Sequence, residues 1–422
     1  MNHFDLAYLA AAPFFLTATW YKRLRHGKYK RSLPGMFGAN LPSPPLPRHR
    51  ERVWMHSVSV GETVAAGAVF RLLREDFPAW EFLSTTTTET GQDQAMRSLA
   101  SATAHDFAPA DLSWNVRRFL AAYEPSIYLF FETEIWPNTL MECGRRRMPV
   151  FMVNGKLSER SSRGYARLGG LLRKPLSNVR TFLMQTEGDA DRLRRVVGPK
   201  AEILVTGNVK FDNLPAPLDA AARRELRARW GLADDAFVVL AGSTHPREER
   251  LVLEGFRQLK AVVPGARLVI APRHPERFDA VAADLATVSP VNRTTSGVPC
   301  QNPDAVILLD EMGVLARSFG AADIGMVGGA WNPIGGHNLL EVTAHGIPVV
   351  HGPGMHAQKE IMRILTSHDA STACGEEAIG ETLIRLAKDE DLRRALGARG
   401  QAAALENRGA ARRVVDHIKS RI

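Results

Sequence analysis

The sequence contains few cysteines, and their spacing matches neither a metal site nor a disulfide framework. Cys143, Cys300 and Cys374 are the three cysteines among 422 residues, and long stretches of chain separate them. Zinc sites and disulfide frameworks need cysteines in close, regular sets. The pattern therefore excludes a small disulfide-stapled scaffold and indicates a reducing compartment.

Two common nucleotide-binding motifs are also missing from the sequence. No Gly-x-Gly-x-x-Gly follows the first predicted strand, and no Gly-x-x-x-x-Gly-Lys-Ser/Thr occurs. These absences argue against dinucleotide oxidoreductases and P-loop NTPases. There is no long low-complexity tract and no internal repeat of 20 to 50 residues. A globular composition over 422 residues predicts two domains.

Acidic residues are scarce at the N-terminus. Residues 1–50 contain eight Lys and Arg and a single acid, Asp5, so they carry +7 of the total net charge of +9. No basic stripe with interleaved aromatic residues continues through the rest of the chain. The charge therefore does not predict nucleic-acid binding.

Residues 4–21 are largely apolar and end in the aromatic pair Trp20 and Tyr21. A basic cluster follows them, which is the reverse of the order in a cleaved signal peptide. An apolar segment, interfacial aromatic residues and basic residues together favour a helix held at an anionic membrane surface. Asp5 and Pro13 leave open whether the helix spans the bilayer or lies in the interface. A buried core helix is the alternative.

From residue 51 onward, short β-rich runs alternate with helical periodicity, which predicts βαβ units and parallel sheets. The pattern stops near residues 213–219 and then begins again. We expect a membrane-anchor helix and basic segment at 1–38, a Pro-rich linker at 39–50, and two doubly wound domains at 51–212 and 213–422. Predicted strands of the first half are Val53–Ser57, Glu81–Thr87, Ser126–Phe131, Val150–Val153, Thr181–Gln185 and Ile203–Thr206.

Charged side chains follow several predicted strands of the first domain. Glu62 follows the first strand, Glu132 and Glu134 follow "FF" in "FFETEIWPN", and Lys210 lies in "VTGNVKFD". Because the carboxyl ends of parallel strands share one edge, we expect these groups to meet there. A carboxylate with apolar neighbours is suited to general-base work. For each acid alone, a helix-capping role is the alternative.

The second half contains loops that suit an anionic ligand. Arg273 follows the strand "RLVIAP" and could meet a nucleotide phosphate. A Gly-rich loop precedes Asn338 and Glu341, whose spacing is that of a helix capping box, and a helix N-terminus binds anions. Four nearby histidines raise the question of a metal, but they lack the close pairing of zinc ligands. Two Asp-x-Asp pairs, beginning at Asp189 and Asp389, are predicted to lie in first helical turns and are interpreted as structural.

Taken together, these stretches resemble the Kdo transferases, which add 3-deoxy-D-manno-octulosonic acid (Kdo) to the lipid A precursor of lipopolysaccharide. The resemblance covers nearly the whole chain. It rests on motifs that occur in the family's order: "HSVSVGET", "FFETEIWPN", "NGKLSERSSRGY", "GNVKFD", "PRHPERF" and "GGHNLLE". It implies a GT-B fold of two Rossmann-like domains facing across a cleft. It also implies an inverting transfer from CMP-Kdo to lipid IVA at the cytoplasmic face of the inner membrane, with no metal and no cofactor.

The resemblance also implies roles for individual residues. Glu62 matches the catalytic base, and Glu132 and Lys210 match groups that stabilise the transition state. The residues that match the CMP site are Pro272, Arg273, Met312, Gly313, Val314, Asn338, Leu339, Leu340 and Glu341.

The sequence departs from the family pattern at three positions. Val314 stands where Glu is frequent, and Leu339 and Glu89 stand where Pro is usual. Glu89 and Asn154–Lys156 could mark an altered acceptor. Two other functions remain open: a GT-B transferase or epimerase with a different nucleotide sugar, and a non-catalytic sugar-binding protein at the membrane surface.

Overall fold

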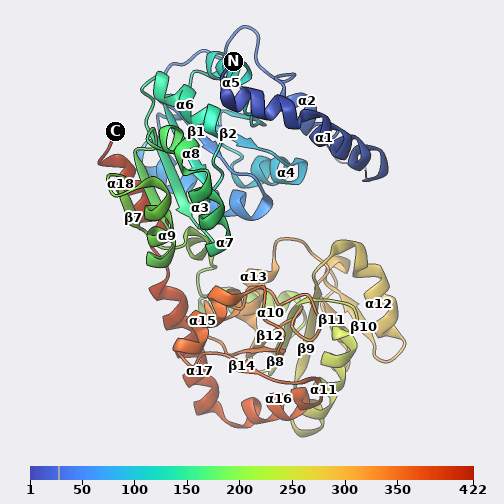
Figure 1. Cartoon of the computed structure of the whole chain (residues 1–422). Coiled ribbons are helices and arrows are strands. Elements are labelled where there is room, and N and C mark those ends of the chain that lie inside the picture. The colour runs from blue at the N-terminus through green and yellow to red at the C-terminus, as the bar shows by residue number, and fades with distance from the viewer. Residues whose placement is uncertain (27–28) are drawn as a thin grey trace. The chain divides into compact units, whose positions relative to one another are not determined.

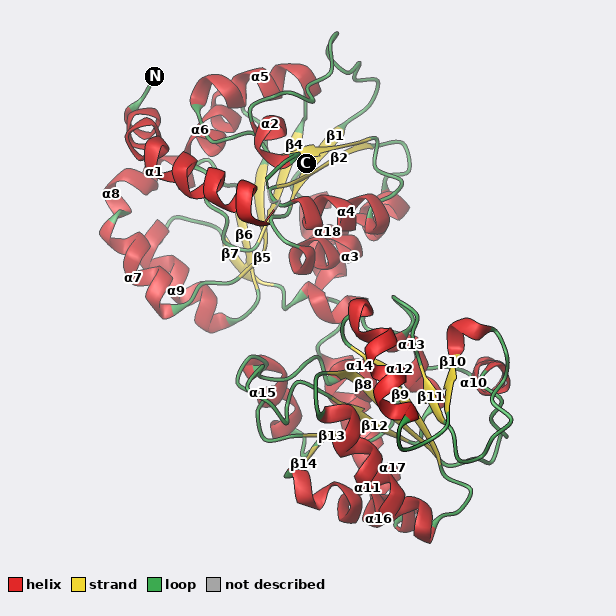
Figure 2. Cartoon of the chain, turned by 90° about the vertical axis from the view of Figure 1, so that its right-hand side faces the viewer, coloured by secondary structure: helices red, strands yellow, loops and turns green. Residues whose placement is uncertain are grey.

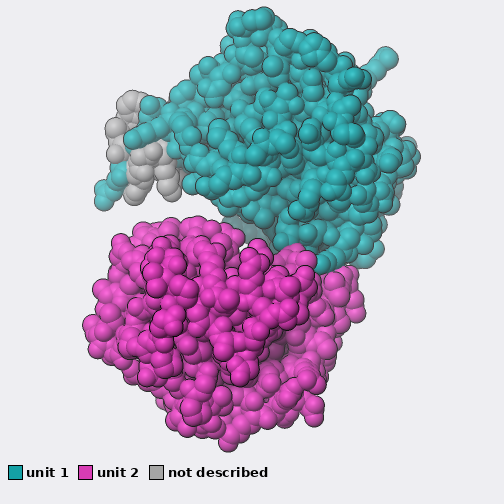
Figure 3. All heavy atoms as spheres, turned by 180° about the vertical axis from the view of Figure 1, so that it is seen from behind, with its two compact units in different colours: residues 1–213, 407–422 teal, residues 214–406 magenta. Residues whose placement is uncertain are grey.

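The computed structural model describes residues 1–26 and 29–422, except for the side chains of residues 15, 16, 18–22, 24 and 26. Trp20, Tyr21, Lys22 and Lys28, on which part of the anchor prediction rests, therefore lie outside the described side chains. Within these limits the chain forms two compact units, which Figure 3 colours separately. Unit 1 contains residues 1–213 and 407–422, and unit 2 contains residues 214–406.

Unit 1 is built on a parallel sheet of seven strands within the described chain, in the order β3-β2-β1-β4-β5-β6-β7. Figure 1 labels β1, β2 and β7 of this sheet. Its strands are β1 (Arg52–His56), β2 (Glu81–Thr86), β3 (Ala104–Phe107), β4 (Ile127–Phe131), β5 (Val150–Gly155), β6 (Thr181–Met184) and β7 (Ile203–Val205). Helices cover both faces of this sheet (Figure 2), so the strands are continuous apolar runs rather than alternating ones.

The helices of unit 1 divide between the two faces of the sheet. The face under α3, α4 and α18 holds one apolar cluster, and the face under α5, α6, α8 and α9 holds the other. The helices are α1 (His3–His26), α2 (Ser32–Met36), α3 (Val60–Asp76), α4 (Glu89–Ser98), α5 (Ser113–Tyr123), α6 (Pro137–Arg145), α7 (Glu159–Arg167), α8 (Gly169–Leu176), α9 (Glu187–Val197), η1 (Val209–Asn213) and α18 (Ala410–Lys419).

Unit 2 repeats this architecture with the strand order β10-β11-β9-β8-β12-β13-β14, again parallel throughout its described residues. Its strands are β8 (Val238–Thr244), β9 (Arg267–Pro272), β10 (Val291–Arg293), β11 (Val306–Leu308), β12 (Ile324–Val327), β13 (Val349–His351) and β14 (Thr372–Ala373). Its α-helices are α10 (Ala220–Arg229), α11 (Glu248–Val262), α12 (Phe278–Ala286), α13 (Leu315–Ser318), α14 (Leu340–Thr343), α15 (Lys359–Ser367), α16 (Ile379–Lys388) and α17 (Glu390–Glu406).

The prediction of two doubly wound sheets is confirmed, and the predicted strands lie within about two residues of their observed ends. Three short edge strands, β3, β10 and β14, were not predicted. Edge strands carry less buried apolar surface than central strands, so their sequences show a weaker pattern. Residues 39–50 contain neither helix nor strand, as the prolines predict.

One domain assignment is wrong. Residues 407–422 were expected in the second domain, but they belong to unit 1. The reason is the apolar face of α18, where Val414, Val415 and Ile418 are buried in the same cluster as α3. Arg412 reinforces this packing through an ion pair to Asp76 at 3.0 Å. The other boundary, between residues 213 and 214, lies one residue from the expected position.

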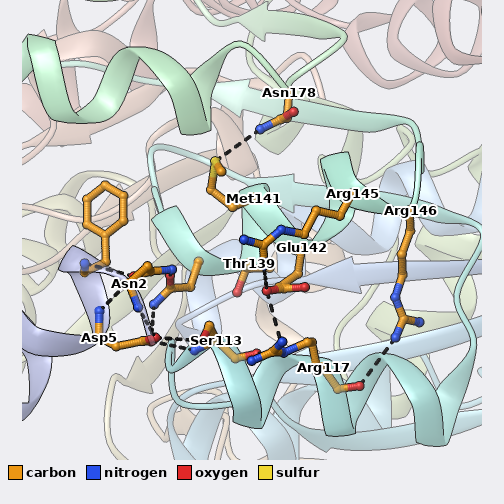
Figure 4. Close-up of polar contacts among 12 residues, drawn as sticks. Asn2, Asp5, Ser113, Arg117, Thr139, Met141, Glu142, Arg145, Arg146 and Asn178 are labelled. Atoms are coloured by element: carbon orange, nitrogen blue, oxygen red, sulfur yellow. Dashed lines mark hydrogen bonds and ion pairs between the residues drawn. The ribbon is translucent and has the colours of Figure 1, made fainter.

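Helix α1 is joined to unit 1 by buried hydrogen bonds at its N-terminal end (Figure 4). Asp5 Oδ1 accepts from the Ser113 amide at 2.7 Å and from Asn138 Nδ2 at 3.0 Å, and Asp5 Oδ2 accepts from the Ser113 hydroxyl at 2.7 Å. Ser113 is the first residue of α5, so Asp5 caps a helix more than one hundred residues away. Tyr8 donates to Asp111 at 3.1 Å. None of the helices in the described residues has the length and apolar character needed to cross a membrane.

Candidate active site

Glu62 lies in the first turn of α3, directly after β1. Its Oε2 accepts from the Val58 amide at 2.8 Å and its Oε1 accepts from the Ser59 hydroxyl at 2.9 Å. Ser59 is the N-cap residue and in turn accepts from the Glu62 amide. This is a variant of the capping box in which the Val58 amide and the Ser59 hydroxyl replace the N-cap amide as donors, so the capping role considered for Glu62 is real. The carboxylate is 8% exposed, and each oxygen retains a further lone pair.

Glu132 directly follows β4, which is the neighbour of β1 in the sheet. Its backbone has φ of 60°, in the left-handed region that residues other than glycine rarely adopt. Such a conformation costs on the order of 1–3 kcal/mol and persists only where surrounding contacts hold it. Glu132 Oε1 accepts from Lys210 Nζ at 2.7 Å. Glu132, the residue with the strained backbone, therefore provides the carboxylate that pairs with the candidate cation Lys210.

Lys210 reaches this edge from the far side of the sheet because η1 turns back from β7 toward α3. Two amides fix the turn: Val209 N donates to Asn154 Oδ1 and Lys210 N donates to Asn208 Oδ1, both at 3.0 Å. Asn154 is fully buried, at the end of β5, and also has left-handed φ, 58°. Its side chain therefore orients η1, a positioning role that the sequence analysis missed. The "NGK" motif that contains Asn154 was the available signal.

Burial and neighbouring charges raise the pKa of two acids of this cluster, Glu62 and Glu134. Burial is the main cause that raises the pKa of Glu62, and the negative charge of Glu132 raises it further, whereas the Val58 and Ser59 hydrogen bonds and Lys210 lower it. Burial also raises the pKa of Glu134, with Glu62 and Glu132 adding to the shift. Three carboxylates and one ammonium group thus share a site in which burial favours a carboxylate of enhanced basicity.

The structure therefore brings together the residues that the sequence singled out in the first domain. A buried carboxylate of raised pKa can remove a proton from a hydroxyl group near neutral pH. An ammonium group held by a second carboxylate can stabilise negative charge that develops during a reaction. The arrangement suits transfer to a hydroxyl acceptor.

In unit 2, the loops after β8 and β9 are joined at Thr244. The Thr244 carbonyl accepts from the Arg273 amide at 3.0 Å and from Arg277 Nη1 at 3.1 Å. Pro272 is the last residue of β9, so Arg273 leaves the carboxyl end of the sheet with an exposed side chain. This placement agrees with the expectation for a nucleotide-binding loop in a parallel sheet.

Glu248 orders the Gly-rich loop after β12, and the sequence analysis did not identify it. This carboxylate is 2% exposed and accepts from three backbone amides, those of His245, Gly329 and Trp331, at 2.9, 2.8 and 3.1 Å. It thus connects the loop after β8 to the loop after β12. The acid three residues after His245 in "THPREE" was the available signal.

The predicted capping box at Asn338 differs from the observed one. Asn338 Oδ1 accepts from the amide of Leu340, two residues on, at 3.1 Å, and Asn338 Nδ2 donates to Glu341 Oε1 at 3.3 Å. Helix α14 is one short turn, and its N-cap residue is Leu339, which makes no side-chain capping bond. The prediction of Asn338 as the N-cap residue is therefore wrong by one position, although its side chain does bond to Glu341. Burial raises the pKa of Glu341, and Asn338 and Arg273 oppose the shift.

The Met312–Gly313–Val314 segment is a bend that leads into α13. Gly313 has φ of 80°, a conformation that glycine adopts freely, and Met312 is 61% exposed. Val314 is the N-cap residue of α13 and makes no side-chain capping bond. In this segment, backbone groups are therefore the available polar contacts for a ligand.

The residues considered for metal binding are dispersed. Among residues 1–26 and 29–422, no group of three or more His, Cys, Asp or Glu side chains could hold a metal ion. His345 contacts the Ala316 carbonyl at 2.7 Å and His351 contacts that of Gly352 at 2.7 Å. Asp189 accepts from the Leu157 amide at 2.9 Å and Asp389 caps α17 through Leu392. These two acids are structural.

Solved structures with the same architecture define the class of fold. UDP-GlcNAc 2-epimerase from Neisseria meningitidis bound to UDP-GlcNAc has a TM-score of 0.58 at 13% identity, covering 87% of this chain and 100% of that one. A glycosyltransferase from Rickettsia africae has a TM-score of 0.55 at 11% identity, covering 88% and 99%. The protein therefore has the GT-B fold of two Rossmann-like units.

Sequence comparison identifies the family within this class. Residues 20–213 match the family model described as 3-deoxy-D-manno-octulosonic-acid transferase (kdotransferase). The 3-deoxy-D-manno-octulosonic acid transferase of Haemophilus influenzae is 32% identical over 426 residues, covering 97% of this chain and 96% of the relative. That of Bordetella pertussis is 32% identical over 436 residues, covering 99% and 98%. The chain belongs to the 3-deoxy-D-manno-octulosonic acid transferase family and is a glycosyltransferase.

Proposed function

We propose that this enzyme transfers Kdo from CMP-Kdo to the lipid A precursor lipid IVA, with inversion at the anomeric carbon and without a metal ion, in lipopolysaccharide synthesis. The observation that carries the proposal is the cluster of Glu62, Glu132 and Lys210 at one sheet edge in a chain that matches a Kdo transferase over 97% of its residues. The CMP site is proposed at the residues already named after β9, before α13 and around α14.

In the proposed reaction, Glu62 takes the proton of an acceptor sugar hydroxyl. The hydroxyl oxygen bonds to C2 of Kdo on the face opposite to CMP, the bond between C2 and the phosphate oxygen breaks, and its electron pair leaves with CMP. One base opposite the leaving group is what inversion requires. Lys210, held by Glu132, stabilises the negative charge of the transition state.

The proposed location is the inner membrane, with both units on its cytoplasmic face. The support lies in α1 and its charge: Leu6, Leu9 and Phe14 are 60%, 45% and 85% exposed, and the sequence has basic residues in the last turns of the helix and after it. An amphiphilic segment of this kind binds an anionic lipid surface. At that surface the enzyme would meet an acceptor that is itself a membrane lipid.

The test supplies the purified 422-residue chain with lipid IVA and CMP-Kdo generated in situ, with EDTA present. Mass spectrometry of the lipid is expected to show a gain of one or more Kdo masses. Glu62→Gln is expected to lose this gain, whereas Glu75→Gln, at the exposed end of the same helix, keeps it. If the wild type adds no Kdo under conditions in which a reference Kdo transferase is active, the proposed donor or acceptor is wrong. A product that requires metal would contradict the metal-independent reaction.

A further inference from the structure

Two histidines of unit 2 share a single contact that has no assigned role. His245 Nε2 and His337 Nε2 lie 2.8 Å apart, and their rings stack with centroids at 5.1 Å and an interplanar angle of 8°. His245 follows β8 and is 5% exposed. His337 lies in the Gly-rich loop after β12, above Gly329, where an added Cβ would come within 3.0 Å of the His337 ring. The loop therefore fixes the ring against its partner.

This contact fixes the protonation of the two Nε2 atoms. A hydrogen bond between two imidazole nitrogens requires one Nε2–H donor and one bare Nε2 acceptor. If both nitrogens carried protons, both would be donors and the contact would open. The pair can still take up one proton with the contact kept, because the Nδ1 atom of the donor ring can accept it, whereas protons on both Nε2 atoms would open the contact.

The surroundings keep the pair neutral in the absence of a ligand. Burial first, then the charges of His274, Arg277 and Arg273, lower the pKa of His245 to about 4. Burial, His245, Arg273 and His274 lower the pKa of His337 to about 4. The facing acids do not offset this effect, because each already has partners. Glu248 binds three backbone amides, Glu249 pairs with Arg277 at 2.9 Å, and Glu341 accepts from Asn338.

An anion bound beside the two histidines would favour their protonated form. A negative charge within about 4–6 Å favours the charged form of a histidine and shifts its pKa by about 1–3 units. The exposed Arg273 supplies a permanent positive charge at the same loop, and the carboxyl ends of β8 and β9 are where a parallel sheet receives its ligand. When an anion is bound, the protonated histidine pair would add a positive charge to the permanent charge of Arg273.

We propose that the His245–His337 pair receives the phosphodiester anion of the nucleotide-sugar donor and takes up a proton as the donor binds. The inference rests on the proposed function for the identity of the donor, but it concerns two residues outside the proposed CMP site. It predicts that donor affinity depends on pH even though a phosphodiester does not titrate near neutral pH.

The experiment is titration calorimetry of the full-length protein with cytidine 5′-(methyl phosphate), a phosphodiester that mimics the donor linkage. Titrations in buffers of different ionisation enthalpy give the number of protons taken up per ligand. We expect about half a proton or more at pH 6 and about none at pH 8, with affinity about two- to tenfold tighter at pH 6. Plain CMP is unsuitable at pH 6 because its own phosphate titrates there.

Three variants complete the design. His337→Gln and His245→Gln keep a polar amide in place of the ring but cannot gain a proton, so each is expected to lose proton uptake and the pH dependence of affinity. His368→Gln, at a half-buried histidine paired with Glu406, is the matched control and is expected to keep both. Thermal melting monitored by circular dichroism verifies that each variant is folded. If one of the two Gln variants does not fold, the other is sufficient for the test.

The outcomes separate the inference from the proposed donor. Binding of the cytidine ligand without proton uptake by the wild type would overturn the inference and leave the donor intact. Proton uptake that persists in a folded Gln variant would also overturn it. No binding of the cytidine ligand at either pH, with binding of the uridine counterpart, would overturn both.

Discussion

At the scale of single residues, the Glu62 carboxylate has two functions that can be separated. It closes the capping box of α3 with Ser59, and it is the proposed base. In Glu62→Gln, the amide oxygen can accept from one of the two donors, the Val58 amide or the Ser59 hydroxyl, and the NH2 group faces the other, so one capping bond is lost. Ser59→Ala removes a capping bond while leaving the carboxylate in place.

We therefore expect Glu62→Gln to lower kcat by about 10²–10⁴-fold, the usual contribution of a general base. Both variants are expected to lower the free energy of unfolding by about 0.5–2 kcal/mol, the usual value of a helix cap. Ser59→Ala should lower kcat by less than about tenfold. Steady-state kinetics and denaturant unfolding of both variants provide the measurement. Equal losses of kcat would show that capping, and not proton transfer, explains the effect of Glu62.

A second residue-scale prediction concerns pH. Burial raises the pKa of Glu62, so the acid limb of the kcat/KM profile should lie above the ordinary glutamate value of about 4.3. Glu132 raises this pKa and Lys210 lowers it. Glu132→Gln should therefore move the acid limb to lower pH, and Lys210→Met should move it to higher pH. Residual rates measured from pH 4 to 8 test the two directions, and a shift in the same direction for both variants would contradict the cluster.

At the scale of elements, the first turn of α1 is held to unit 1 by Asp5, as drawn in Figure 4. Asp5→Ala would leave the Ser113 amide and the Asn138 side-chain amide without this acceptor, at a cost of about 1–3 kcal/mol. Leu6→Ala is the control, because Leu6 is 60% exposed, and should change stability by less than about 0.5 kcal/mol. Urea unfolding of the two variants gives both values.

The pH dependence of the Asp5 contact follows from the direction of the Asp5 pKa shift. Burial opposes ionisation of Asp5, but the hydrogen bonds from Ser113 and Asn2 win and hold its pKa below the usual value. A carboxyl whose pKa is lower in the folded state contributes stability above its unfolded-state pKa. The difference in stability between wild type and Asp5→Ala should therefore be full near pH 6 and disappear as pH falls through the folded-state pKa, below about 3.8. A difference that is the same at all pH values would exclude the ionised contact.

At the scale of the whole molecule, residues 407–422 pack against unit 1 and not against unit 2, which precedes them in the sequence. Val414, Val415 and Ile418 are at most 1% exposed against α3, and burial of each such side chain contributes about 1.5–3 kcal/mol. Removal of residues 407–422 should therefore destabilise unit 1 by several kcal/mol or prevent its folding. Removal of residues 420–422 alone, where Ile422 is 47% exposed, is the control and should have little effect. Calorimetric unfolding of both truncations tests this, and an unchanged transition in the longer one would contradict the packing.

The sequence by itself determined the fold class and the elements that carry the candidate site. Short apolar runs that alternate with helical stretches indicate which residues are buried. That local signal was enough to predict two parallel sheets divided near residue 213. The family motifs brought Glu62, Glu132 and Lys210 into consideration together. Strand-end placement explained why acids follow β1 and β4.

Only the tertiary structure decided which of these groups meet. The sheet order places β1 beside β4, and the buried Asn154 turns η1 back so that Lys210 pairs with Glu132, 78 residues earlier in the chain. It also showed Asp5 as the cap of α5 and α18 as part of unit 1. The physical reason is the same in each case. Periodicity along a chain fixes which face of an element is buried, but the partner of that face depends on contacts between distant segments.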